Sequence, residues 1–425
     1  MIYFTNLLKI YSIHNNSTEH KIPHLYTENE STHNFNSAIS RNNIFVCFGA
    51  FISVSLPKIH KNKKMNTLKT ILSAALLALC ASPSAFADQF IPANNGNITY
   101  TGRIDFSNPL SPRFTYPGVS AALNFEGTTL KMKAKPGSGY FMVEIDDRHP
   151  FKINFTETDT VLTLVNSLEP GAHTARISYA VEGYNYNPEF RGFYIDNDAR
   201  LLDAPKRPER RIEFIGNSIT CGYGIEGENG KEDFSFRTEN HFYSYATLTA
   251  RALNAEHVVV ARSGYGIYRN YGGPKEGNPN CIPALYERTL FNDSTVMWDF
   301  NRFRPQVVCV NLGTNDVSLR VIDRERLTVA YRNFIKRLRG YYPEAKIVML
   351  TGCMAFGDGL KALKETLDAV VKEANDNGDK NVYRFDMSQQ DGTLGYGSDY
   401  HPSMRQAQKM ADELIPYLRE LMNWE

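Results

Sequence analysis

The sequence predicts two folds in succession, an all-β sandwich over residues 88–203 and an α/β domain with a mostly parallel sheet over residues 206–425. Three observations lead to this prediction. Apolar and polar residues alternate in the first region, as in half-buried strands. In the second region, continuous apolar runs alternate with stretches of helical spacing. Between them lies "DAPKRPERR" (203–211), a charged stretch with two prolines that is typical of a linker.

The strands of the sandwich are marked by alternating residues. Turn signals such as "KPGSG", "DDRHP" and "EPGAH" separate them, and short strands at such intervals favour a jelly-roll-like sandwich. The residues expected on one buried face are Leu130, Met132 and Ala134, then Phe141, Val143 and Ile145, then Ala175, Ile177, Tyr179 and Val181.

The α/β domain is marked by buried strands and amphipathic helices. Strands are expected at "RIEFIG", "HVVVA", "QVVCVNL", "KIVML" and "VYRF", and a helix at "YSYATLTARAL". Residues at helical spacing predict three further helices. Their expected core positions are Leu327, Ala330, Tyr331, Phe334 and Leu338, then Leu360, Leu363, Leu367, Val370 and Ala374, then Met404, Ala407, Met410, Ala411, Leu414 and Leu418.

The N-terminal part has the pattern of an export signal. Residues 1–64 show no steady period, and we expect an untranslated or disordered extension there. Lys69, the apolar run 71–79 and Ala85-Phe86-Ala87 then predict a signal peptide over 65–87. The protein is therefore expected in the periplasm or outside the cell. Lipid attachment at Cys80 is the less favoured alternative, because Leu79 precedes it where a small residue is expected.

Composition excludes several classes of partner. The net charge of +1 in 425 residues gives no reason to expect nucleic-acid binding. No apolar run reaches the roughly 18–20 residues that span a bilayer. The cysteines after residue 87 show no zinc-site spacing, so we expect no metal or organic cofactor. A bond between Cys221 and Cys281 stays open, and we expect a monomer.

Polar residues follow the predicted strands of the α/β domain. Ser218 follows "RIEFIG", Gly264 follows "HVVVA", Asn315 follows "VVCVNLG", and His401 precedes the last helix. Ligands collect at the carboxyl ends of such strands. A serine hydroxyl needs a base such as histidine to take its proton, and the attacked carbonyl oxygen needs fixed hydrogen-bond donors. Together these residues suit acyl transfer.

These motifs, "GNSIT", "SG", "GTND" and "DYHP", resemble in their order the four sequence blocks of SGNH hydrolases. "FIGNSITCGYG" after a β-sandwich is similar to family 2 carbohydrate esterases. The resemblance covers about residues 90–425 and implies a three-layer α/β/α hydrolase domain that removes acetyl groups from plant polysaccharides. It implies Ser218 as nucleophile and His401 as base. The oxyanion donors would be the backbone amides of Ser218 and Gly264 and the side chain of Asn315.

Two residues depart from the usual SGNH pattern. Asn217 stands where the blocks usually have aspartate before the serine; it can brace the turn but carries no charge. Asp399 lies two residues before His401 rather than three, and either its carboxylate or a backbone carbonyl would orient the imidazole. Tyr400, between them, is a candidate for contact with the sugar.

Two alternatives compete with a carbohydrate acetylesterase. One is an exported lipase or thioesterase of the same fold, although no apolar lid is evident. The other is a carbohydrate-binding protein without activity. A binding protein has no need to keep Ser218, Asn315 and His401 together, so the sequence favours the enzyme.

Overall fold

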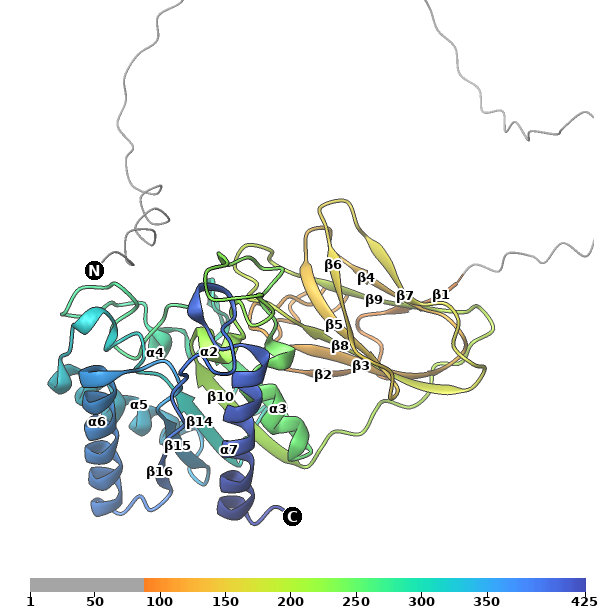
Figure 1. Cartoon of the computed structure of the whole chain (residues 1–425). Coiled ribbons are helices and arrows are strands. Elements are labelled where there is room, and N and C mark those ends of the chain that lie inside the picture. Colours follow the sequence, from red (N-terminus) through yellow and green to blue (C-terminus); the bar gives the residue numbers. More distant parts are fainter. Residues whose placement is uncertain (1–87) are drawn as a thin grey trace, which may run out of the picture. The chain divides into compact units, whose positions relative to one another are not determined.

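The computed structural model describes residues 88–425. The predicted extension (1–64), the predicted signal peptide (65–87) and Cys80 lie outside the described residues. The first part of the described chain is a sandwich of two antiparallel sheets, whose strand orders are β1-β9-β4-β7 and β2-β3-β8-β5-β6 (Figure 1). The strands are β1 (Gln89–Pro92), β2 (Thr99–Thr101), β3 (Ser120–Glu126), β4 (Leu130–Ala134), β5 (Gly139–Ile145), β6 (Phe151–Phe155), β7 (Val161–Val165), β8 (Ala172–Tyr179) and β9 (Phe190–Ile195).

The predicted strand faces form the core between these sheets. The alternating positions of β4, β5 and β8 are all buried, and β4 shows why: its apolar residues are fully enclosed while Lys131 and Lys133 reach outward. The period-two pattern therefore predicted both the strands and the face of each that packs inward.

The second part is built on a parallel sheet of order β11-β10-β14-β15-β16. Its strands are β10 (Arg210–Gly216), β11 (Ala255–Ala261), β14 (Val307–Asn311), β15 (Lys346–Leu350) and β16 (Val382–Phe385). The chain runs from β10 to β11 on one side and later to β14 on the other. The order thus reverses at the carboxyl end of β10, which is where ligand sites form in open α/β sheets.

Helices cover both faces of this sheet, which confirms the predicted three-layer α/β/α fold (Figure 1). Helices α3 (Tyr245–Ala252) and α7 (Met404–Met422) pack on one face, and α5 (Arg324–Tyr341) and α6 (Gly357–Asp376) pack on the other. Most predicted core positions are buried. Met404 is an exception, with 46% of its surface exposed, because it begins α7 beyond the edge of the core.

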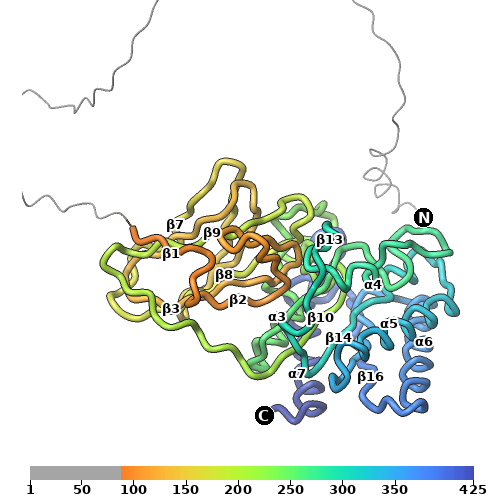
Figure 2. Tube along the Cα trace, turned by 180° about the vertical axis from the view of Figure 1, so that it is seen from behind, coloured from red at the N-terminus to blue at the C-terminus, as the bar shows by residue number. Residues whose placement is uncertain are grey.

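The remaining elements are short. They are α2 (Ser218–Cys221), η2 (His241–Tyr243), α4 (Ile282–Leu285), η3 (Ser318–Arg320), η4 (Ser398–Tyr400) and a hairpin of β12 (Arg288–Leu290) and β13 (Asp293–Met297). The sequence did not predict this hairpin. It lies against the sandwich, where the Phe291 amide donates to Thr115 Oγ1 over 2.9 Å (Figure 2).

A buried ion pair joins the sandwich to the parallel sheet. Arg103 of the sandwich donates to Glu213 of β10 over 3.1 Å, and both side chains are fully enclosed. The Arg103 guanidinium also lies 5.2 Å from the centre of the Trp298 ring and donates to backbone carbonyls of Tyr286 and Arg288. Removing either charged partner would leave the other buried and unpaired.

Neither membrane spans nor disulfides occur in the described part. No helix within residues 88–425 is long and apolar enough to cross a bilayer. Cys221, Cys281, Cys309 and Cys353 are all free thiols, so the open question of a bond between Cys221 and Cys281 is answered in the negative.

Candidate active site

Ser218 begins α2 directly after β10, at the point where the strand order reverses. Asn217 caps this one-turn helix: its Oδ1 accepts from the Ile219 amide over 3.1 Å. The helix ends at Gly222, whose left-handed backbone (φ +78°) suits glycine. Ser218 is buried with 7% of its surface exposed, and the strand, the cap and the tight turn fix its position.

His401 lies within hydrogen-bond distance of that hydroxyl. Its Nε2 is 2.9 Å from Ser218 Oγ, across 183 positions of sequence. Its Nδ1 is 3.2 Å from the backbone carbonyl of Asp399. Because a carbonyl can only accept, Nδ1 carries the proton, and the free Nε2 lone pair faces the hydroxyl. Burial lowers the pKa of His401 to about 4, so the imidazole is neutral at neutral pH.

The carboxylate of Asp399 points to a different partner. Its Oδ2 accepts from the hydroxyl of Tyr223 over 2.9 Å. The Tyr223 ring lies against the His401 imidazole, with 4.3 Å between centroids, and stacks on Phe234 at 3.9 Å. The contact to His401 thus comes from the Asp399 backbone, while the carboxylate fixes an aromatic ring beside the imidazole.

The histidine loop is held by backbone bonds to residues 224–232. The amides of Ser398, Asp399 and Tyr400 donate to the carbonyls of Gly224, Glu232 and Gly230 over 2.8, 2.9 and 3.1 Å. Asp399 and Tyr400 both have positive φ, 51° and 57°, a conformation that costs energy outside glycine. A Cβ on Gly224 would lie 2.6 Å from Ser398 Cβ, so only glycine permits this approach.

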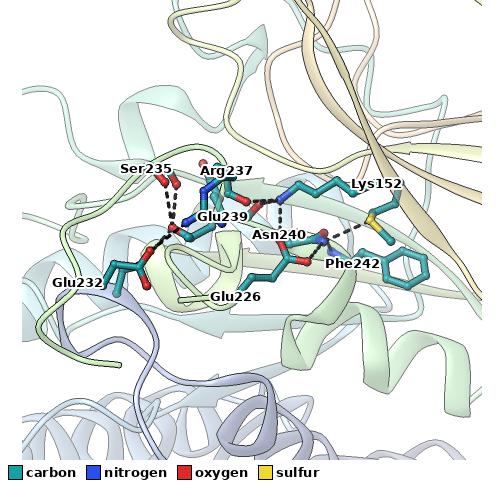
Figure 3. A network of polar contacts seen from close by, with 11 residues as sticks. Lys152, Glu226, Glu232, Ser235, Arg237, Glu239, Asn240 and Phe242 are labelled. Atoms are coloured by element: carbon teal, nitrogen blue, oxygen red, sulfur yellow. Dashed lines mark hydrogen bonds and ion pairs between the residues drawn. The ribbon is translucent and has the colours of Figure 1, made fainter. Parts of the chain in front are cut away.

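The supporting segment is itself fixed to the sandwich by Lys152 of β6 (Figure 3). Its ammonium donates to Glu226 over 2.6 Å and to the backbone carbonyls of Arg237 and Glu239 over 2.8 and 2.7 Å. Glu226 also accepts from the Asn240 side chain over 2.9 Å. The sandwich therefore contacts the segment that holds the histidine loop.

Two of the three predicted oxyanion donors, Gly264 and Asn315, lie on loops that are bonded to each other. Asn315 Nδ2 donates to the carbonyl of Tyr265 over 2.8 Å, which leaves its second N–H for another acceptor. Gly264 has a φ of +78°, and a Cβ built on it would meet nothing within 4 Å. Its backbone is thus accessible, and a side chain there would be strained.

Asp316 and Arg269 fix these loops relative to each other. The buried carboxylate of Asp316 accepts from the amides of Ile267, Tyr268 and Arg269 over 2.8–3.0 Å. Arg269, 1% exposed, donates back to the carbonyls of Asn315 and Asp316. Asp316 therefore acts through backbone bonds to the loop that follows Gly264.

Tyr400 and Trp298 differ in position. Tyr400 is 48% exposed, and its ring lies 5.5 Å from that of Tyr396 beside the histidine loop, so it is free to contact a substrate. Trp298 is buried against Arg103 and takes no part in the site.

Sequence reasoning did not find Tyr223 or Glu182. Tyr223 lies inside the quoted string "FIGNSITCGYG", so its nearness to Ser218 was a signal. Glu182, in the loop that follows β8, gave none. In the described chain, Glu182, Cys221 and Glu239 also form the one group whose side chains lie close enough together to hold a metal, with ligand atoms within 4.8 Å.

The fold is that of an SGNH-type domain preceded by a β-sandwich. Residues 100–205 match the family Carbohydrate esterase 2 N-terminal, and residues 214–409 match the GDSL-like Lipase/Acylhydrolase family. An acetylxylan esterase / glucomannan deacetylase of Cellvibrio japonicus is 31% identical over 79% of this chain and 91% of its own length. The chain belongs to carbohydrate esterase family 2.

Other relatives agree. Cellulase/esterase CelE of Acetivibrio thermocellus is 40% identical over 78% of this chain, but the chain spans only 40% of that protein's length. The structure of a family two carbohydrate esterase from Clostridium thermocellum in complex with cellohexaose matches with a TM-score of 0.72, 39% identity and coverage of 77% of this chain and 100% of that one. The structure of a family two carbohydrate esterase from Cellvibrio japonicus matches with a TM-score of 0.72 and 28% identity. The match covers 80% of this chain and 99% of that one.

Proposed function

We propose that this chain is a serine esterase that removes O-acetyl groups from plant polysaccharides or their oligosaccharides. The contact of Ser218 Oγ with His401 Nε2, 2.9 Å, is the observation that carries the proposal. The relatives' names support the substrate: one is an acetylxylan esterase / glucomannan deacetylase, and a solved relative binds cellohexaose.

The reaction would proceed through an acetyl-enzyme. Ser218 Oγ attacks the acetyl carbonyl while His401 Nε2 takes its proton. The ester C–O bond then breaks, and His401 returns the proton to the departing sugar hydroxyl. His401 next takes a proton from water, whose oxygen attacks the acetyl carbon. The bond from that carbon to Ser218 Oγ then breaks, His401 returns the proton to Ser218 Oγ, and acetic acid leaves.

The other residues would orient the base and stabilise charge. The Asp399 carbonyl keeps His401 in the tautomer with Nδ1–H, as its 3.2 Å contact suggests. The amides of Ser218 and Gly264 and the side chain of Asn315 would bind the oxyanion. Tyr400 would contact the sugar ring. None of these steps needs a cofactor.

Export and a monomeric state belong to the same proposal. The pattern of residues 65–87 supports action in the periplasm or outside the cell, where acetylated polysaccharide is found. All the proposed catalytic residues come from one chain, so a monomer would suffice. We also propose the division into a sandwich over 88–203 and a hydrolase domain over 206–425.

The test compares residues 88–425 with its Ser218→Ala variant. Acetate release from acetylated xylan, acetylated glucomannan and a long-chain ester is measured. We expect release from a polysaccharide by the wild type and a loss of at least about 10⁴-fold in the variant. Turnover of the long-chain ester alone would favour a lipase, and no turnover by either folded protein would favour a binding protein.

A further inference from the structure

We propose that Glu182, which the sandwich contributes, is a positioning residue of the esterase site that fixes the turn presenting the Gly264 amide. This inference rests on the proposed function, since it assigns Gly264 to the oxyanion. It also gives the sandwich a part in the chemistry, through a residue far from the sequence blocks of the hydrolase domain.

The first observation is a two-point contact. Glu182 follows β8, is 1% exposed, and accepts from the backbone amide of Ser263 over 2.9 Å. Its second carboxyl oxygen accepts from the hydroxyl of the same residue. One buried side chain thus holds both the amide and the hydroxyl of Ser263. This restricts rotation of the Ser263 backbone and of its side chain together.

The second observation is the place of Ser263 in the chain. It directly precedes Gly264, so the peptide that joins them carries the Gly264 N–H. The other end of the turn is held from the hydrolase domain, because the Tyr271 amide donates to the Gly264 carbonyl over 2.8 Å. Between these two anchors lies a glycine with φ +78°, which has unusual conformational freedom. Without Glu182, one anchor is lost and the amide can rotate away from the oxyanion.

The third observation is the environment that keeps Glu182 in place. Its own amide donates to Glu239 Oε1 over 3.2 Å, and Glu239 Oε2 is buried without a hydrogen-bond partner. Burial and the neighbouring Glu182 raise the pKa of Glu239 well above its usual value, which favours a neutral Glu239 beside Glu182. Burial also raises the pKa of Glu182, while the hydrogen bonds from Ser263 and the charge of Arg262 act against that rise.

The same cluster could instead hold a metal ion, with Cys221 as third ligand. The contacts argue otherwise. Glu182 is engaged with Ser263 through both oxygens, and burial raises the pKa of the Cys221 thiol well above its usual value, so the thiolate that metals prefer is disfavoured.

The test measures kcat and KM for deacetylation by Glu182→Ala, Glu182→Gln and Ser263→Ala in the 88–425 chain. We expect kcat of Glu182→Ala to fall about 10²-fold with KM nearly unchanged, because an oxyanion donor is misplaced. Glu182→Gln keeps an oxygen for the Ser263 amide and should recover to within about tenfold of wild type. Ser263→Ala loses only the hydroxyl contact and should lose about three- to tenfold.

The matched control is Glu256→Gln. Glu256 is also a buried glutamate that joins the two parts, since it accepts from Thr101 Oγ1 over 2.8 Å, but it contacts no residue of the site. It should leave kcat unchanged. The affinity for methylboronic acid, whose adduct with Ser218 places an oxygen at the oxyanion position, should weaken in Glu182→Ala in proportion to kcat.

Each outcome separates the two proposals. If Ser218→Ala remains active, the proposed function fails whatever Glu182 does. If Ser218→Ala is inactive but folded Glu182→Ala keeps wild-type kcat, only the positioning role fails. If Glu182→Ala does not fold, an unchanged kcat in Ser263→Ala overturns the positioning role of Glu182. A loss of activity after treatment with a chelator would assign the cluster to a metal instead.

Discussion

The two residues of the proposed catalytic pair are held in different ways. Ser218 is fixed by its own neighbourhood: a central strand, the Asn217 cap and a one-turn helix, all within a few residues. His401 lies on a loop with two strained residues, and this loop depends on backbone bonds to residues 224–232. The proposed nucleophile, Ser218, is thus placed by local structure, and the proposed base, His401, by contacts between distant segments. We therefore expect substitutions in distant segments to disturb Ser218 less than His401.

The largest effect on stability should come from the ion pair between Arg103 and Glu213, which lies in β10. Arg103→Ala leaves Glu213 buried and unpaired in β10, and we expect unfolding free energy to fall by about 3–5 kcal/mol, measured in urea. The protein that remains folded should keep its kcat, because Ser218 is held by its own turn. As a control, the double variant Arg103→Met/Glu213→Leu should regain stability. A loss of kcat in folded Arg103→Ala would show that the nucleophile depends on the sandwich.

The next largest effect is expected at Asn315, the proposed side-chain donor to the oxyanion. Asn315→Ala removes a side-chain N–H that can reach the oxyanion, and kcat should fall about 10²- to 10³-fold. Its bond to the Tyr265 carbonyl is lost as well, so the melting temperature must be followed. Asp323→Ala serves as a control. It removes the side chain that caps the N-terminus of α5, and so reports what a loss of local stability alone does to kcat. An unchanged kcat in Asn315→Ala would remove it from the oxyanion site.

The pH profile tests the histidine side. Burial lowers the pKa of His401 from 6.5 to about 4, and only the neutral imidazole can act as base. The acidic limb of kcat/KM should therefore lie near pH 4. Because the folded pKa is below the unfolded one, the contribution of His401 to stability is complete above about pH 6.5 and declines as the pH falls toward 4. Circular dichroism at each pH separates the two effects, and a limb near 6.5 in folded protein would contradict the burial of His401.

The smallest effect is expected at Asp399. Asp399→Asn keeps the backbone carbonyl at His401 Nδ1, and asparagine tolerates the left-handed backbone, so kcat should change less than about tenfold. Tyr223→Phe removes the other partner of the carboxylate contact and should have a similarly small effect. A fall of 10³-fold in Asp399→Asn with Tyr223→Phe unaffected would show that the carboxylate orients the imidazole in the reacting enzyme.

Much of the fold was determined by local sequence. Alternation in "TLKMKAK" predicted β4 and its inward face, and the apolar run "RIEFIG" predicted β10, because burial on one or both faces leaves a periodic trace in the residues of a single element. The same logic placed Ser218 after a strand and His401 before α7. Met404 was predicted wrongly, since a helical period does not tell where the core ends.

Tertiary structure decided how the site is held. The sequence left two candidates for the group that orients His401, and only the folded loop brings the Asp399 carbonyl to Nδ1 and its carboxylate to Tyr223. Likewise, nothing in the sequence marks Glu182 or Lys152, because each acts on a segment that lies far away along the chain. A residue's periodicity records whether it is buried, but its partner is set by the packing of whole elements, and that information is absent from any one stretch of sequence.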